Sequence, residues 1–203
     1  MLKKISLVAL ALCVAGCATK FGNNFNSTAV LNLTPGVTTR TEALNSIAST
    51  PTSSETTTIK KDVAGKDLKE PIVVERMFYY FRDMNATPSV VEKEPKRYAW
   101  LSFAGDKLIG YWVASTFRDD STNFDESRVK SLEKGKTTQQ DTLRLLGTPS
   151  GKAIYPAASE IDGSRWYYKV RWWADNRMHA KTLRVDFDKS QVLTDFDLNI
   201  GAE

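Results

Sequence analysis

Residues 132–150 read Leu132-Glu-Lys-Gly-Lys-Thr-Thr-Gln-Gln-Asp-Thr-Leu-Arg-Leu-Leu-Gly-Thr-Pro-Ser150, and this stretch decides the predicted fold. Residues 33–52 read Leu33-Thr-Pro-Gly-Val-Thr-Thr-Arg-Thr-Glu-Ala-Leu-Asn-Ser-Ile-Ala-Ser-Thr-Pro-Thr52 and repeat the same pattern. The offset is 99 residues up to Ile47 and Leu146, and 98 residues after them. Agreement at the glycine, both threonines, the apolar residues and the Thr-Pro pair indicates an internal duplication.

Each copy predicts a short helix that begins at a threonine. The expected N-caps are Thr38 and Thr137, whose hydroxyls can accept from amides of the first turn. Gly147 is a natural residue at which the second helix ends, whereas the first copy has Ala48-Ser49 there and predicts a less clean end. The expected buried pairs, at i, i+3 spacing, are Leu44 with Ile47 and Leu143 with Leu146.

Downstream of each helix the apolar period changes from about 3.6 to 2, which predicts β-strands. The expected strands are 76–81, 98–103 and 107–113 in the first copy, and 165–173, 182–188 and 192–198 in the second. Polar loops are expected over 53–69 and 151–164. The fold class is therefore predicted as α+β: two tandem repeats, each with one or two short helices packed on a three- to four-stranded antiparallel sheet.

The first residues predict a bacterial lipoprotein signal. Lys3 and Lys4 precede a short apolar run, too short to span a bilayer core of about 20 residues, and Val14-Ala15-Gly16-Cys17 resembles a lipobox. The alternative is an ordinary secretory signal cleaved elsewhere. Residues 1–16 are expected to be removed, Cys17 to become lipidated and Ala18 to favour the outer membrane. Several acyl chains would hold the protein stably on the membrane.

The remaining chain divides into four predicted parts. Residues 17–30 are polar and predict a flexible tether, 31–114 the first repeat, 115–131 a connector and 132–203 the second repeat. Loss of Lys3 and Lys4 lowers the net charge from +4 to +2, and no basic run suggests nucleic acid. Cys13 would leave with the signal, so no disulfide is expected.

Short motifs in the second copy resemble the BamE/SmpA/OmlA-type outer-membrane lipoprotein domain. They are Leu132, Gly135, Thr137, Leu143, Leu146, Gly147, Pro149, Trp166, Tyr167, Tyr168, Val185, Phe187 and Asp188. A duplicated unit of this kind also resembles the β-lactamase-inhibitor-protein fold. The resemblance covers about residues 31–200, more loosely in the first copy, and implies a non-enzymatic role in envelope assembly, stress response or inhibition.

The sequence offers few groups for catalysis. His179 is the only histidine and is predicted on the surface; no Gly-x-Ser-x-Gly elbow surrounds a serine. Gly135-Lys136-Thr137 lacks the earlier glycine of a phosphate loop, because Lys130 stands at that place. Four aspartates are predicted on the outer faces of adjacent strands, offset by Lys181 and Arg184. A solvated face is the preferred interpretation, with a Ca²⁺ site and an acid/base pair as alternatives, for Asp186, Asp188, Asp195 and Asp197.

Aromatic and basic residues in 166–173 form the candidate binding surface. One face of this strand carries Trp166, Tyr168, Val170 and Trp172, and the other carries Tyr167, Lys169, Arg171 and Trp173. Exposed Trp, Tyr and Arg are typical anchors at protein interfaces. The candidate partner-binding residues are Tyr167, Arg171, Trp172 and Trp173. The alternative is that the loop 174–181 or the other copy covers them.

These features together predict a non-enzymatic envelope lipoprotein that faces the periplasm from the outer membrane. It would contact the membrane through its lipid and bind another envelope protein as an assembly, scaffold or stability factor. No catalytic residue, metal, cofactor, small-molecule substrate or nucleic acid is expected. The alternative is a proteinaceous inhibitor of a periplasmic or extracellular hydrolase; a hydrolase using the aspartates has the least support.

Overall fold

The computed structural model describes residues 19–89, 94–159 and 161–203. In chain order its elements are β1 (Lys20–Gly22), α1 (Ser27–Leu31), α2 (Arg40–Ile47), β2 (Ser53–Lys61), β3 (Asp67–Asp83), β4 (Lys96–Ala104), β5 (Lys107–Ser115), the 3₁₀ helix η1 (Glu126–Ser131), α3 (Gln139–Leu146), β6 (Gly151–Ile154), β7 (Ser164–Ala174), β8 (Arg177–Phe187) and β9 (Leu193–Ala202). The predicted signal sequence, Cys17 and the predicted cleavage site lie outside the described residues.

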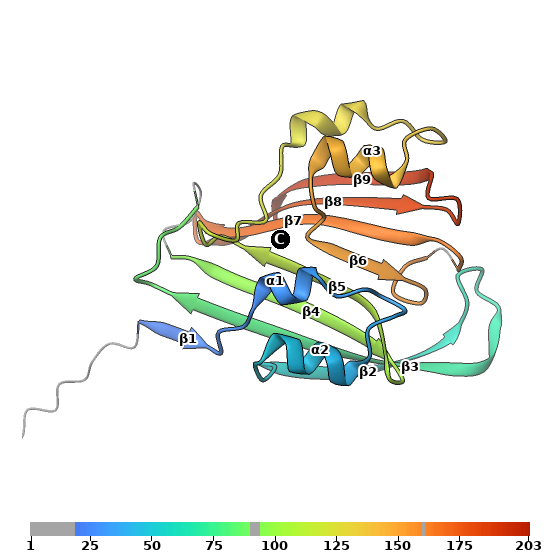
Figure 1. Cartoon of the computed structure of the whole chain (residues 1–203), viewed down its shortest axis with the longest axis horizontal. Coiled ribbons are helices and arrows are strands. Elements are labelled where there is room, and N and C mark those ends of the chain that lie inside the picture. Colours follow the sequence, from blue (N-terminus) through green and yellow to red (C-terminus); the bar gives the residue numbers. More distant parts are fainter. Residues whose placement is uncertain (1–18, 90–93, 160) are drawn as a thin grey trace, which may run out of the picture.

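The described strands form one antiparallel sheet, so the predicted α+β class with two separate small sheets is wrong. Nine strands join in the order β1-β3-β4-β5-β6-β7-β8-β9, with β2 also paired to β3 (Figure 1). Only 15% of the described residues are helical. The predicted polar loops contain three of the strand segments that the sequence analysis missed: β2, the start of β3, and β6.

The short strand β6 is the physical reason for this single sheet. Gly110, Tyr111 and Trp112 of β5 pair with Ala153, Lys152 and Gly151, and β6 in turn pairs with β7. This pairing satisfies the backbone groups at the inner edges of both halves, which two separate sheets would leave exposed. A row of side chains therefore runs across one face of both halves: Met77, Leu101, Tyr111, Lys152, Trp166 and Val185.

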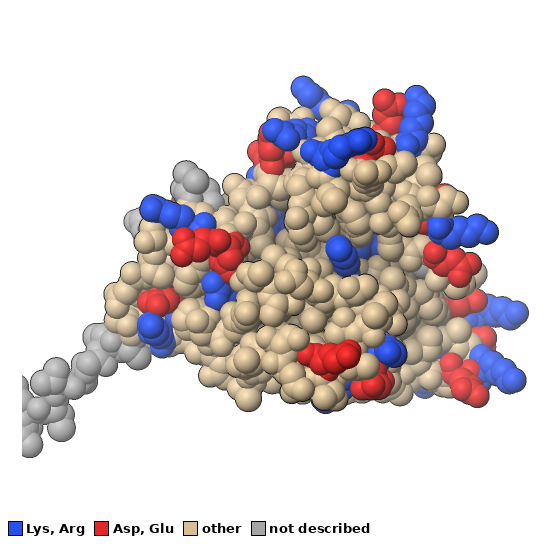
Figure 2. Space-filling view, in the orientation of Figure 1, with Lys and Arg blue, Asp and Glu red and all other residues tan. Residues whose placement is uncertain are grey.

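All described helices lie over this same face (Figure 1). Two apolar clusters fill the space between helices and sheet. The first contains Val30, Ala43 and Ile47 from the helices, and the second contains Val129 and Leu146. Figure 2 shows the helix-covered side, where charged residues of both signs lie mainly around the rim. Burial on one face only explains why buried and less buried residues alternate over 166–171 of β7 and 181–185 of β8.

The two repeated segments adopt matching local structures. In both copies the threonine after the predicted cap is the N-cap: Thr39 accepts from the Glu42 amide and Thr138 from the Asp141 amide, each within a capping box. The preceding threonine instead stabilises the turn before the helix, since the Thr137 hydroxyl accepts from the Glu133 amide at 2.8 Å. The N-caps predicted at Thr38 and Thr137 are therefore displaced by one residue.

The glycine of each copy docks on the strand hairpin that follows in that half. The Gly36 amide donates to the Leu108 carbonyl and the Gly135 amide to the Leu193 carbonyl, both at 2.8 Å. Both glycines have positive φ, +81° and +76°, which other residues rarely adopt. The same turn, helix and docking contact thus occur twice.

The buried face of each helix is rotated from its predicted position. Thr142 and Leu146 are buried in α3, at i, i+4 spacing, whereas Leu143 is 44% exposed. In α2 the corresponding buried pair is Ala43 and Ile47, with Leu44 only partly buried against the core. Ala48, after α2, takes the left-handed conformation at φ 52°.

The predicted tether, residues 17–30, contains structure in its described part. Lys20, Phe21 and Gly22 pair with Asp83, Arg82 and Phe81 at the edge of β3, and α1 follows. Among the described residues no helix has the length and apolar character to cross a membrane.

An ion pair fastens this N-terminal segment to the rest of the fold. Arg97 Nε of β4 lies 2.7 Å from Asp120 Oδ2, with both side chains largely buried. Ser27 Oγ of α1 donates to the same oxygen, Oδ2, and Ser115 Oγ donates to Asp120 Oδ1 at 2.6 Å. The network therefore joins α1, the sheet and the connector between the two halves.

Candidate functional site

The sheet face opposite the helices carries the candidate site, and we call it the open face. Strand alternation places on it the cross-strand row Phe78, Trp100, Trp112 and Tyr167, in which Gly151 separates the last two. The Phe78 and Trp100 ring centroids are 5.0 Å apart, and those of Trp100 and Trp112 are 6.5 Å apart. These aromatic side chains come from both halves of the chain, and the single sheet brings them together.

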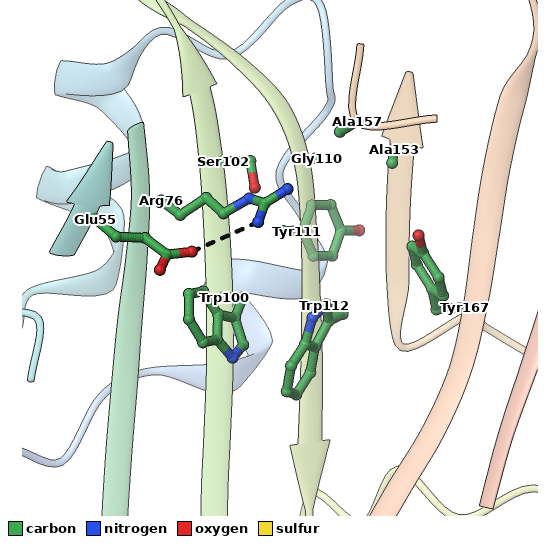
Figure 3. A pocket seen from close by; sticks show the side chains of 10 residues that line it. All are labelled: Glu55, Arg76, Trp100, Ser102, Gly110, Tyr111, Trp112, Ala153, Ala157 and Tyr167. Carbon is green, nitrogen blue, oxygen red and sulfur yellow. Dashed lines mark hydrogen bonds and ion pairs between the residues drawn. The ribbon is translucent and has the colours of Figure 1, made fainter. Parts of the chain in front are cut away.

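A hollow of about 260 Å³ lies in this row (Figure 3). Trp100, Trp112 and Tyr167 lie around it. Small residues at its base keep it open: a Cβ at Gly110 would lie 2.9 Å from Ala153 Cβ. The remaining lining residues are Glu55, Arg76, Ser102, Tyr111 and Ala157.

One exposed ion pair forms the charged rim of the hollow. Arg76 Nη1 lies 3.5 Å from Glu55 Oε1, with exposed side-chain fractions of 47% and 54%. Such solvent-exposed pairs contribute roughly 0–1 kcal/mol, so either group can exchange its partner at little cost. Figure 3 shows the Arg76 guanidinium extended over the hollow. It can therefore meet a carboxylate brought by a bound molecule.

Cations lie against the aromatic rings beside the hollow. Lys169 Nζ is 4.9 Å from the Trp112 ring centroid, and Arg171 Cζ is 5.0 Å from that of Tyr98. Both cations also pair with Glu203. Burial alone raises the pKa of the Glu203 carboxyl, but Lys169 and Arg171 outweigh burial and hold this pKa below its ordinary value. The open face thus combines aromatic area with nearly balanced charge.

The structure brings three of the four predicted binding residues to the open face. Tyr167 lines the hollow, Arg171 lies over Tyr98, and Trp173 is 47% exposed farther along β7. Trp172 points to the opposite face, where it stacks on His179 with centroids 5.6 Å apart. His179 is half-buried rather than freely exposed, and its Nε2 lies 3.2 Å from the Ala174 carbonyl.

The sequence analysis missed the residues that the first half contributes. Trp100, Trp112 and Arg76 were placed on or next to strands, yet their meeting with Tyr167 depends on β6, which was expected to be loop. The two tryptophans lie on consecutive predicted strands, 98–103 and 107–113, which is the one signal that they lie near each other. The strand pattern alone does not indicate that Trp100 pairs with Trp112, because this pairing depends on a register shift between Ser102 and Phe103.

Two of the four aspartates singled out in the sequence, Asp186 and Asp195, take part in ion pairs. Arg165 binds Asp186 through two hydrogen bonds of 2.5 and 3.0 Å, and Arg184 Nη2 donates to Asp195 at 2.6 Å. Lys181, which was expected to offset these charges, lies on the helix side and donates to Glu126. No group of three or more potential metal ligands occurs within the described ranges.

Two other motifs have structural roles. Asp188 closes a turn by accepting from the amides of Ser190 and Val192. Lys136, of the apparent phosphate loop, pairs with Glu133 at 2.7 Å. Both sets of contacts are local and shape the turns in which they occur.

Part of the chain matches the model of a known protein family. Residues 122–197 match the family model described as the outer membrane protein assembly factor BamE domain. This segment spans η1, α3, β6, β7, β8 and part of β9, and so includes Tyr167 but not Trp100 or Trp112. No curated protein and no solved structure matches the chain.

Proposed function

We propose that this protein is a non-enzymatic envelope lipoprotein, acylated at Cys17, that binds another envelope protein as an assembly, scaffold or stability factor. The observation that carries the proposal is the hollow on the open face, lined by Trp100, Trp112, Tyr167 and Arg76. Trp, Tyr and Arg are the residue types most enriched among interface hot spots. The BamE-domain match over 122–197 supports a role in outer membrane protein assembly.

The dimensions of the hollow favour a protein partner over a small substrate. Small-molecule sites are typically ≈ 300–1,000 Å³ and enclose most of their ligand. This hollow is smaller, about 260 Å³, and lies within a broad sheet face. It suits a single apolar side chain of a partner, with a neighbouring carboxylate paired to Arg76. We infer that the partner presents an apolar anchor next to an acidic residue.

The proposed setting is the periplasmic side of the outer membrane. Val14-Ala15-Gly16-Cys17 and the preceding apolar run support export and acylation, and Ala18 supports outer-membrane sorting. The family description is consistent with that compartment.

We also infer that the two halves arose by duplication of one unit. Support comes from the sequence agreement between 33–52 and 132–150, together with the matching capping boxes at Thr39 and Thr138. The equal docking hydrogen bonds from Gly36 and Gly135 add to it. In this view, the open-face site lies where the two copies meet.

A photo-crosslinking experiment in cells tests the partner proposal. A photoreactive phenylalanine analogue replaces Tyr167 in the full chain, and captured proteins are identified by mass spectrometry. Trp112→Ala in the same background should weaken partner binding about 30-fold or more, as expected for a hot-spot residue that costs at least ~2 kcal/mol. Trp172→Ala is the matched control, because it removes the same side chain from the opposite face.

Each outcome has a defined meaning. Specific capture of an envelope protein, lost with Trp112→Ala and kept with Trp172→Ala, supports the proposal. Equal capture by both variants contradicts it. Capture of a soluble hydrolase whose activity is blocked would replace the assembly role with inhibition.

A further inference from the structure

The short strand β1 holds the start of the described chain at one corner of the sheet. Phe21 pairs with Arg82, and the Met84 amide donates to the Thr19 carbonyl at 2.9 Å. Only Ala18 separates Thr19 from Cys17. At ~3.3–3.6 Å per extended residue, the Cα atoms of Cys17 and Thr19 can be at most about 7 Å apart. An acyl group on Cys17 would therefore be close to this corner.

This corner exposes apolar side chains beside cations. Phe21 is 41% exposed and Met84 is 45% exposed. The Arg82 guanidinium lies 4.2 Å from the Phe21 ring centroid, and the Lys20 side chain is 67% exposed. Long cationic side chains beside apolar residues suit a bilayer interface, because their stems can lie in apolar surroundings while the charge reaches water or lipid headgroups.

From these two observations we propose that the β1 corner, formed by Lys20, Phe21, Arg82 and Met84, rests on the lipid surface to which Cys17 is attached. The inference depends on the acylation of Cys17 contained in the proposed function, but not on the binding hollow. The occupant is a membrane rather than a protein because the short connection brings the corner to the bilayer whenever the acyl chains are inserted. The body is then held against the membrane at a defined corner.

Site-specific fluorescence tests the contact. The mature lipoprotein carrying Met84→Cys is labelled with an environment-sensitive thiol dye and reconstituted into phosphatidylcholine vesicles that contain brominated acyl chains. Val63→Cys is the matched control, because Val63 is an exposed apolar residue, 57% exposed, in the turn at the far end of the β2–β3 ribbon. An acylated Cys17 offers no competing thiol.

The Met84 dye should shift to shorter wavelength and be quenched by the brominated lipid, whereas the Val63 dye should change in neither respect. Equal quenching at both positions, or none at Met84, overturns the proposal. A blue shift at Met84 without quenching would indicate that protein, such as a second copy, covers the corner, and also overturns it. The mass of the N-terminal peptide reports acylation separately: an unacylated Cys17 removes the premise, while Tyr167 crosslinking still tests partner binding.

A backbone variant tests the role of β1. A Cβ at Gly22 would lie 2.1 Å from the Tyr80 carbonyl oxygen, and Gly22 has φ +75°, so Gly22→Ala should detach β1 from β3. The corner is then held by a longer free segment, and quenching of the Met84 dye should fall. Gly65→Ala is the control, with φ +81° and no heavy atom within 4 Å of the new Cβ. Unchanged quenching in a folded, acylated Gly22→Ala variant would contradict the proposal.

Discussion

Asp120→Asn should destabilise the protein strongly, because it removes the negative charge paired with Arg97 in the buried network described above. The exposed side-chain fractions of Arg97 and Asp120 are 14% and 13%. Breaking a fully buried pair by removing one partner costs ~3–5 kcal/mol. Arg97 keeps two acceptors, Asn24 Oδ1 at 2.7 Å and the Phe25 carbonyl at 3.1 Å. We therefore expect a loss of about 2–3 kcal/mol in the free energy of unfolding.

Thermal unfolding followed by circular dichroism measures this loss. For a protein of this size, 1 kcal/mol corresponds to ~2–4 °C, so the melting temperature should fall by about 5–10 °C. Asp67→Asn is the control: Asp67 is 85% exposed, lies 3.8 Å from Lys61, and should change stability by less than ~0.5 kcal/mol. The double variant Arg97→Met/Asp120→Asn should lose less than the sum of its single changes. If Asp120→Asn melts within about 1 °C of the unchanged protein, the stabilising role of the network is refuted.

Three further outcomes follow from the helices and the core. Ala48→Gly should raise the free energy of unfolding by about 0.5–1 kcal/mol, measured by urea denaturation, because Ala48 has φ 52° and glycine adopts this conformation without strain; a loss of stability would contradict this. Hydrogen bonds from Thr39 and Thr138 lower the pKa of the Glu42 and Asp141 carboxyls below their ordinary values of 4.5 and 3.8. The ionised carboxyls therefore stabilise the fold fully above those ordinary values, and this stabilisation disappears as pH falls through the lowered pKa values. The variant Glu42→Gln/Asp141→Asn should therefore show a shallower loss of melting temperature between pH 5 and pH 2, and an unchanged slope would exclude this contribution. Leu183→Ala, at a fully buried position of β8, should cost about 3 kcal/mol in chemical denaturation. Leu143→Ala, on the exposed side of α3, should cost less than ~1 kcal/mol. Equal costs for the two variants would show that Leu143 does not lie on an exposed face of α3.

Local patterns predicted much of the secondary structure. The alternation of apolar residues located β7, β8 and β9 to within a few residues, except that β8 begins earlier, at Arg177. The repeated Gly-x-Thr-Thr motif located both α2 and α3. The Gly-x-Thr-Thr motif does not show which of the two threonines is the N-cap, because both hydroxyls accept backbone hydrogen bonds. Only the acidic residue three positions after the cap, Glu42 or Asp141, distinguishes them.

The site could not be predicted because it depends on long-range pairing. A simple hairpin that continues from the pair Ala104–Lys107 would set Trp100 opposite Tyr111. A register shift between Ser102 and Phe103 instead sets it opposite Trp112, on the open face. The predicted separate sheets would also have kept Tyr167 away from both tryptophans. No local pattern indicates that β6 closes this gap.

One edge of the continuous sheet is formed by β1 and β2 and the other by β9, and the two long edge strands carry charged side chains. Lys60 and Lys61 lie on β2, and Asp195 and Asp197 lie on β9. Unpaired backbone groups on an outer strand can recruit a neighbouring molecule and start aggregation. Two copies that approach through the same edge meet like charges, β2 against β2 or β9 against β9. Like charges therefore disfavour pairing of two copies through the same edge, whereas the opposite charges of β2 and β9 do not oppose contact between unlike edges.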